Sequence, residues 1–189
     1  MKKGFTIVEL LMAIGIVAIL LGLITTAASQ SVKSSRTSRA DALCTMVQAG
    51  LATYYAQKAE WPQPLGGKVK SGSLSQSNDE GVNDSTDPDK YVLSASEVRS
   101  MVKALVDETK DGNPLMDISA LFVSRDPGES GGKGNGLDFM SAIKGTKYSK
   151  RKMTTSEMYF GYPDPGSGRF RRFKMVYSIA ADQLTVMRQ

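Results

Sequence analysis

The chain has 189 residues, of which 41% are hydrophobic, and a formal net charge of +5. This length allows one anchor helix and one globular domain of modest size, and excludes two large domains. The absence of histidine excludes histidine-based acid–base catalysis and histidine metal sites, and the single cysteine, Cys44, excludes an intrachain disulfide. We therefore expect a protein that is not an enzyme.

A long apolar span lies near the N-terminus. Between Glu9 and Lys33 there is no charged residue and no proline. As a helix, these roughly 23 residues reach about 34 Å, which is enough to cross the hydrocarbon core of a bilayer. The pattern predicts a transmembrane helix over residues 5–28, and Lys2 and Lys3 in front of it favour a cytoplasmic start.

Glu9 is the informative residue of this span. Placing a carboxylate in hydrocarbon costs free energy unless the group is neutralised or paired. We therefore expect Glu9 to have a function. Simpler interpretations are a plain membrane anchor, an ion pair within one chain, or a secretory signal peptide. The signal peptide is disfavoured because the apolar region is too long and Thr26-Ala27-Ala28 is only a passable cleavage site.

The run Lys3-Gly4-Phe5-Thr6-Ile7-Val8-Glu9-Leu10-Leu11 resembles the N-terminal signature of type IV pilins and type II secretion pseudopilins. The resemblance implies that a membrane-embedded prepilin peptidase removes the leader, residues 1–4, by cutting between Gly4 and Phe5, and methylates the new amine of Phe5. It also implies that Glu9 meets the amine of a neighbouring subunit's Phe5 during assembly. Physically, such pairing relieves two costly charges and fixes the axial stagger of the subunits.

The same resemblance implies a location and a set of partners. The first half of the helix would span the inner membrane, and the C-terminal domain would lie in the periplasm or outside the cell. The expected partners are like subunits, other pilins or pseudopilins, the prepilin peptidase, an inner-membrane assembly platform and the lipid bilayer. The product would be a periplasm-spanning or surface filament.

The helix is predicted to continue over residues 29–60 as an amphipathic segment, because no proline occurs before Pro62. The apolar stripe that supports this prediction consists of Val32, Ala40, Leu43, Val47, Gly50 or Leu51, and Tyr54. Residues 29–38 form a polar collar in which Lys33 and Arg36, with Arg39 after them, face solvent or contact anionic lipid head groups.

A globular domain is predicted over residues 61–189. Trp61-Pro62 and the following glycines end the helix, and residues 66–90 read as a long polar loop. Major pseudopilins bind calcium in a loop, and Asp84, Asp87 and Asp89 are candidate ligands here. Because their spacing matches no EF-hand, a solvated acidic loop without a metal or other cofactor is the preferred interpretation.

The rest of the domain reads as one helix followed by strands. Residues 94–110 form a helix with a Ser94–Glu97 capping box, Ile118–Ser124 is a strand or a turn of helix, and Asp126–Gly136 is a glycine-rich loop. Alternating faces over residues 157–188 predict an antiparallel sheet. The expected fold is α+β and pilin-like, with the long N-terminal helix packed on a C-terminal antiparallel sheet.

A basic stretch lies near the C-terminus. Between Lys144 and Lys174 there are nine basic residues and two acids. The aromatic residues interleaved with them (Tyr148, Tyr159, Phe170 and Phe173) make nucleic acid one candidate partner. The preferred interpretation is contact with the next subunit, because residues 79–117 contain ten acids against four bases.

The combined interpretation is a structural filament subunit. A type II secretion pseudopilin is favoured by the missing disulfide and the modest size of the chain. A surface type IV pilin or a DNA-uptake pilin is the alternative within the family. A monomeric membrane-anchored binding protein is the alternative of a different class.

Overall fold

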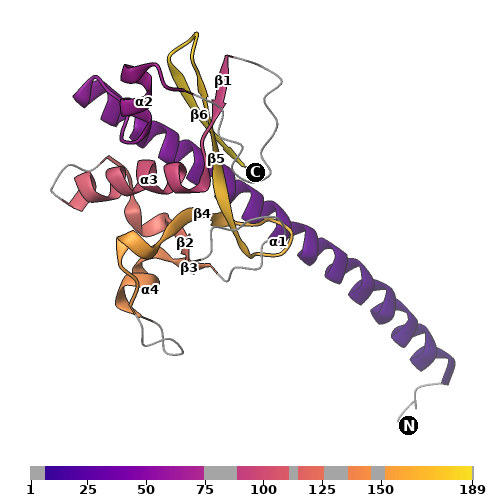
Figure 1. Cartoon of the computed structure of the whole chain (residues 1–189). Helices are drawn as coiled ribbons and strands as arrows, with labels where there is room; N and C mark the ends of the chain where they lie inside the picture. Colours follow the sequence, from indigo (N-terminus) through magenta and orange to yellow (C-terminus); the bar gives the residue numbers. More distant parts are fainter. Residues whose placement is uncertain (1–6, 75–88, 111–114, 126–135, 146–151, 189) are drawn as a thin grey trace.

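The computed structural model describes residues 7–74, 89–110, 115–125, 136–145 and 152–188 (Figure 1). Helix α1 runs from Ile7 to Lys58 without interruption. At 1.5 Å per residue, its 52 residues measure about 78 Å. The apolar N-terminal half and the amphipathic second half are therefore one helix, and Gly15 and Gly22 do not break it.

Only the second half of α1 packs on the domain, while its N-terminal half projects away from it (Figure 1). Ala40, Leu43, Val47 and Leu51 are all buried, which confirms the predicted apolar stripe over this part of the helix. The stripe does not include Val32, whose side chain is exposed. The prediction was wrong at this position because the domain covers α1 only from about the level of Arg36.

The predicted loop over residues 66–90 is wrong at both of its ends. Helix α2 covers Leu65–Ser71, and strand β1 covers Lys90–Val92. The glycine pair and the lysines after Pro64 suggested a loop, but Leu65 is buried and anchors the short helix in the core. A Cβ atom at Gly66 would lie 2.2 Å from the carbonyl oxygen of Trp61, so only glycine allows this close approach.

Helix α3 covers Ala95–Lys110 and begins with the predicted capping box. The backbone N–H of Ser94 donates to Oε2 of Glu97 at 2.7 Å, and the N–H of Glu97 donates to Oγ of Ser94 at 3.4 Å. Two backbone donors that have no partner within the helix are satisfied in this way.

The predicted antiparallel sheet is present and is larger than expected. The strands within residues 157–188 are β4 (Tyr159–Pro163), β5 (Phe170–Ser178) and β6 (Gln183–Arg188). Strands β1, β2 (Phe122–Ser124) and β3 (Leu137–Asp138) join them. The order is β1-β5-β4-β2-β3, β6 pairs with β5, and every pair is antiparallel.

Three short elements complete the described part of the domain. A 3-10 helix, η1 (Ile118–Ala120), directly precedes β2, so the segment predicted as a strand or a turn of helix contains both. Helix α4 (Phe139–Lys144) and the 3-10 helix η2 (Thr155–Glu157) lie between β3 and β4. Elements this short have no readable periodicity, and α4 is anchored by the buried ring of Phe139.

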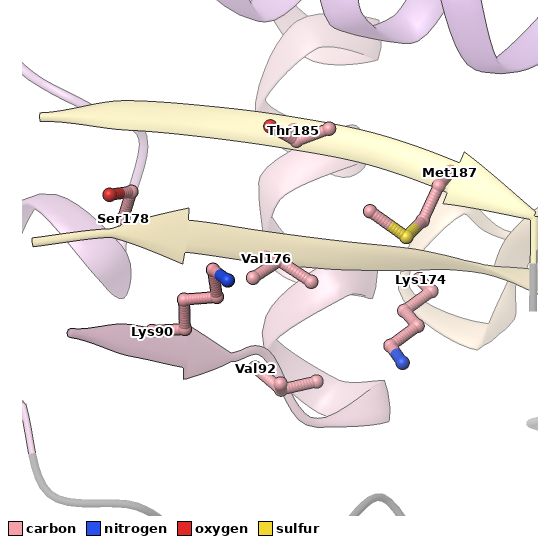
Figure 2. A pocket seen from close by; sticks show the side chains of 7 residues that line it. All are labelled: Lys90, Val92, Lys174, Val176, Ser178, Thr185 and Met187. Carbon is pink, nitrogen blue, oxygen red and sulfur yellow. The ribbon is translucent and has the colours of Figure 1, made fainter. Parts of the chain in front are cut away.

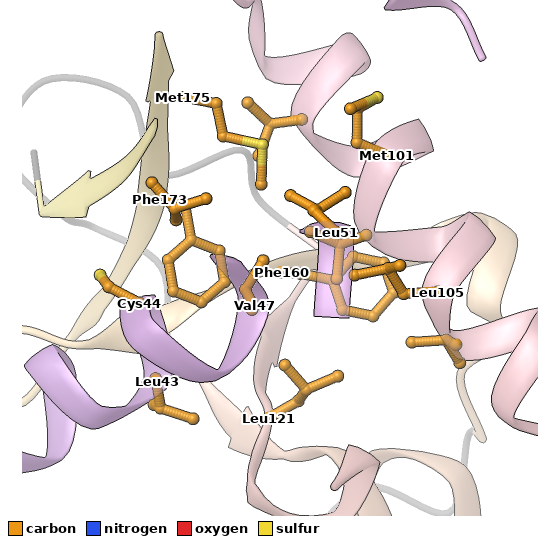
Figure 3. Close-up of a cluster of buried hydrophobic side chains, with 14 of the residues drawn as sticks. Leu43, Cys44, Val47, Leu51, Met101, Leu105, Leu121, Phe160, Phe173 and Met175 are labelled. Carbon is orange, nitrogen blue, oxygen red and sulfur yellow. The ribbon is translucent and has the colours of Figure 1, made fainter. Parts of the chain in front are cut away.

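The hydrophobic core lies between the sheet and the helices α1 and α3, which both contact β4 (Figure 3). Its side chains include Leu43, Cys44, Val47, Leu51, Met101, Leu105, Phe160, Phe173 and Met175. Burial raises the pKa of the Cys44 thiol to about 11, so this cysteine is a neutral packing residue at physiological pH. A long helix packed on an antiparallel sheet confirms the predicted α+β class.

Candidate assembly site

The N-terminal half of α1 exposes an apolar surface. Large hydrophobic side chains that are 51% to 79% exposed follow one another from Ile7 to Ile24. Within the described residues, α1 is the one helix that is long and apolar enough to cross a membrane. A helix that is apolar on all sides needs a bilayer or other helices around it.

Glu9 lies in the first turn of α1, at the outer end of this apolar surface. Its position places one carboxylate on an otherwise uncharged half-helix, as the sequence predicted. The other residues of the predicted processing site, Lys2, Lys3, Gly4 and Phe5, lie outside the described residues. The pairing of Glu9 with the Phe5 amine of a neighbour therefore stays a prediction.

The basic collar marks the point where α1 meets the domain. Nη2 of Arg39 lies 2.7 Å from Oδ1 of Asp138, just before α4. The guanidinium of Arg36 packs over Gly168, which has a positive φ of 71° and lies in the connection between β4 and β5. These two collar residues contact the domain, and Arg39 ties the helix to it by an ion pair.

A hydrogen-bonded cluster around Asp182 holds the C-terminal end of α1 to the sheet. Oδ2 of Asp182 accepts a hydrogen bond from the Tyr55 hydroxyl at 2.6 Å. Oδ1 accepts from Nε1 of Trp61 at 2.9 Å and from the Tyr177 hydroxyl at 2.7 Å. The ring centroids of Tyr55 and Trp61 are 4.5 Å apart, so the cluster also contains an aromatic pair. It connects α1, the segment after α1, β5 and the turn before β6.

The Asp182 cluster favours the ionised carboxylate. The hydrogen bonds from Tyr55 and Trp61 hold the pKa of Asp182 below its usual range, against an opposing effect of burial. Burial and its hydrogen bond to Asp182 raise the pKa of Tyr177, and the separate hydrogen bond from Tyr55 to Asp182 raises the pKa of Tyr55. At neutral pH one carboxylate therefore accepts three hydrogen bonds from neutral donors.

Replacing Asp182 by asparagine will destabilise the domain at pH 7 by about 1 kcal/mol, because an NH2 group, which donates, replaces one of the two acceptor oxygens. The loss is modest because the side chain is exposed to solvent. Because the pKa of Asp182 is lower in the folded protein, the carboxylate stabilises the fold fully at pH values above the ordinary carboxyl pKa. This stabilisation is lost as the pH falls through the pKa of the folded state. The difference between the two proteins will therefore shrink as the pH falls below the ordinary carboxyl pKa. Urea unfolding followed by circular dichroism at several pH values measures it.

Asp41→Asn is the matched control, because Asp41 forms an exposed ion pair with Arg188 at 2.8 Å. We expect it to change stability by less than about 0.5 kcal/mol. A loss at Asp182 that is no larger than the loss at Asp41 would show that the cluster does not stabilise the fold.

A second cluster joins α2, β1 and α3. Oε1 of the buried Glu97 accepts from Nζ of Lys68 and from the Tyr91 hydroxyl, both at 2.6 Å. Burial raises the pKa of Glu97, but the hydrogen bonds from Lys68, Tyr91 and Ser94 outweigh it and lower the pKa overall. The capping residue of α3 thus also holds α2 in place.

The candidate calcium ligands are only partly described. Asp84 and Asp87 lie outside the described residues, and Asp89 directly precedes β1. Within the residues that the structure describes, no three aspartate, glutamate, cysteine or histidine residues are grouped so that they could hold a metal ion.

Among the described residues, the basic stretch near the C-terminus presents only part of the aromatic surface expected of a nucleic-acid site: Tyr159 is half-buried, and Tyr148 lies outside the described residues. Phe170 and Phe173 are buried, so their rings cannot stack on bases. Arg172 is buried as well, and Nε of Arg171 lies 2.9 Å from Oδ1 of Asp164. These residues contribute to the domain itself.

The sequence did not predict that the Asp182 and Glu97 clusters connect different helices and strands. In the first cluster, Asp182 is separated from Tyr55 and from Trp61 by more than 120 residues along the chain. The one available signal was the Ser94–Glu97 capping box, which located Glu97 but did not indicate Lys68 or Tyr91.

The comparisons with known proteins agree with the sequence resemblance. A family model described as the prokaryotic N-terminal methylation motif matches residues 1–25. Searches of curated proteins and of solved structures found no significant match to the chain. The matched residues include the Gly4-Phe5 junction, Glu9 and most of the apolar half of α1. The motif points to a structural subunit, and the long helix packed on an antiparallel sheet is consistent with a pilin fold.

Proposed function

We propose that the protein is a subunit of a type IV pilus-like filament, most favourably a type II secretion pseudopilin. It is cut between Gly4 and Phe5, methylated at Phe5, and polymerises through α1. The single observation that carries this proposal is the apolar half of α1, which is exposed on all described sides and begins with the processing motif.

The exposed half of α1 can be covered in two environments, one before assembly and one after it. Before assembly, the bilayer surrounds its side chains. In the filament, the same surface packs against the α1 helices of neighbouring copies. A head-to-tail helical array suits this chain, because a contact between two different surfaces does not close and continues indefinitely.

Glu9 supplies the register of this array. After cleavage, the cationic amine of Phe5 and the carboxylate of Glu9 are four residues apart along the same chain. Pairing between adjacent subunits neutralises both groups where water is scarce. The domain is then carried in the periplasm or outside the cell.

The pseudopilin assignment is supported by the way in which the domain is held together. Many type IV pilins close the C-terminal region with a disulfide, and this chain has only Cys44, which is buried. The Asp182 and Glu97 clusters connect distant elements of this domain by hydrogen bonds.

Mass spectrometry of the protein purified from its native membrane tests the proposal. The expected mature chain begins with N-methylated Phe5. In the matched variant Gly4→Val, a β-branched side chain occupies the position where the peptidase approaches the backbone, and we expect the leader to be retained. A wild-type chain that begins near Ser29 would instead indicate an ordinary secreted domain, and one that begins at Met1 would indicate a plain anchor.

A further inference from the structure

A groove of about 280 Å³ lies on the face of the sheet that points away from the core (Figure 2). Strands β1, β5 and β6 line it side by side, with β5 in the middle. Its lining residues are Lys90, Val92, Lys174, Val176, Ser178, Thr185 and Met187.

The alternation of side chains along β5 produces this groove. Met175 and Tyr177 are buried in the core, so Lys174 and Val176 point to the opposite face. The register places Val92 opposite Val176 on one side, and Thr185 opposite it on the other. The floor of the groove is therefore mainly apolar.

Two lysines lie at opposite ends of this floor. Lys174 is four residues from Ser178 along β5, and Ser178 is the cross-strand partner of Lys90. Four residues of strand correspond to about 13 Å, so the two backbone positions are separated by slightly more than this distance. A complementary surface would place two carboxylates at this separation with an apolar group between them.

We propose that this groove binds a second copy of the chain, through the acid-rich stretch of residues 79–89. This stretch contains five acids and no base. Copies held side by side by α1 would repel one another through these charges unless each stretch faced cations on a neighbour. The inference rests on the proposed filament function. Assembly brings copies together at a high effective concentration, so a groove with low affinity for the stretch is still occupied.

The order of residues in the stretch matches the groove. Glu80, Val82 and Asp84 alternate with small or polar residues. Two carboxylates four positions apart span at most about 13 to 14 Å, which is close to the separation of the lysine positions. Val82, between the two carboxylates in the sequence, supplies the apolar side chain that such a surface requires.

Photo-crosslinking in the assembled full-length protein tests this contact. A photoreactive amino acid replaces Thr185 in the groove, and the control carries it at Lys152, which is exposed and does not line the groove. Cells are grown to contain isotopically heavy and light copies. The expected result is a covalent dimer from position 185 whose crosslinked peptides join heavy to light chains within residues 79–89.

Charge reversal sharpens the test. Lys90→Glu combined with Lys174→Glu will lower the yield of the dimer roughly tenfold, because attraction at both ends of the groove becomes repulsion. Adding Glu80→Lys and Asp84→Lys will restore the yield. Lys152→Glu, which changes the net charge by the same amount per residue, will leave it unchanged.

The remaining outcomes overturn the inference in distinguishable ways. A crosslink confined to one chain would show that the stretch occupies its own groove, and a crosslink to another protein would show a different partner. Filaments that assemble with Glu9 intact but give no crosslink from position 185 would refute the groove contact alone. A chain that is neither processed nor assembled would refute the filament function and the groove contact together.

Discussion

Replacing Glu9 by valine will abolish filament assembly and leave the protein inserted in the membrane. Removing one partner of an ion pair in a low-dielectric environment leaves the other charge uncompensated, at a cost of about 3 to 5 kcal/mol. This corresponds to a loss of association of roughly a hundredfold or more. Valine adds to the apolar surface of α1, so membrane insertion will not suffer. Sheared filaments measure assembly, and membrane fractionation measures insertion.

Glu9→Asp and Val8→Ala are the controls for this experiment. Aspartate keeps the charge on a shorter side chain, so we expect assembly to be reduced and not lost. Val8 is exposed on the same turn of α1 and carries no charge, so its truncation tests whether any change at this end of the helix disturbs assembly. Normal filaments from Glu9→Val would show that assembly does not need the Glu9 carboxylate, whereas a wild-type protein that forms no filaments would favour the monomeric anchored protein.

Replacing Phe160 by alanine will destabilise the domain by about 3 to 5 kcal/mol. Phe160 lies on β4 with 1% of its surface exposed, and its ring centroid lies 6.5 Å from that of Phe139 on α4. Strand β4 contacts both α1 and α3, so the cavity would open in the middle of the core (Figure 3). Urea unfolding of the full-length protein in detergent, followed by circular dichroism, measures the loss.

Val176→Ala is the matched control in the same sheet. Val176 is half-buried on the opposite face, so its truncation removes less packing, and we expect a loss of about 1 kcal/mol or less. Equal losses at Phe160 and Val176 would mean that the core between the sheet and α1 contributes less than its burial indicates. A variant that still assembles with an unstable domain would show that α1 alone drives polymerisation.

Local patterns explain why parts of the fold could be predicted. The span from Glu9 to Lys33 contains neither charge nor proline, so the first half of α1 can be read from composition alone. The capping box at Ser94 and Glu97 involves residues three positions apart. The alternation in β5 reflects one core face and one outer face. Each of these signals is contained within a few neighbouring residues.

Other parts depend on contacts that no local pattern records. Leu65 starts α2 because it fills a space beside the core, and the glycines after it favour a loop when they are read alone. Strand β1 is only three residues long and forms because β5 offers it an edge. Val32 has the spacing of a buried residue but lies beyond the reach of the domain.

The sequence by itself therefore determined the processing motif, the position of Glu9, the length of the apolar helix and the α+β class, because each arises from neighbouring residues. The tertiary structure decided how the domain is held without a disulfide and where its outer groove lies. Asp182 meets Tyr55 and Trp61 across more than 120 residues, and Lys90 shares a groove with Lys174 only because β1 pairs with β5. Such meetings depend on the packing of the whole chain, which brings distant residues together.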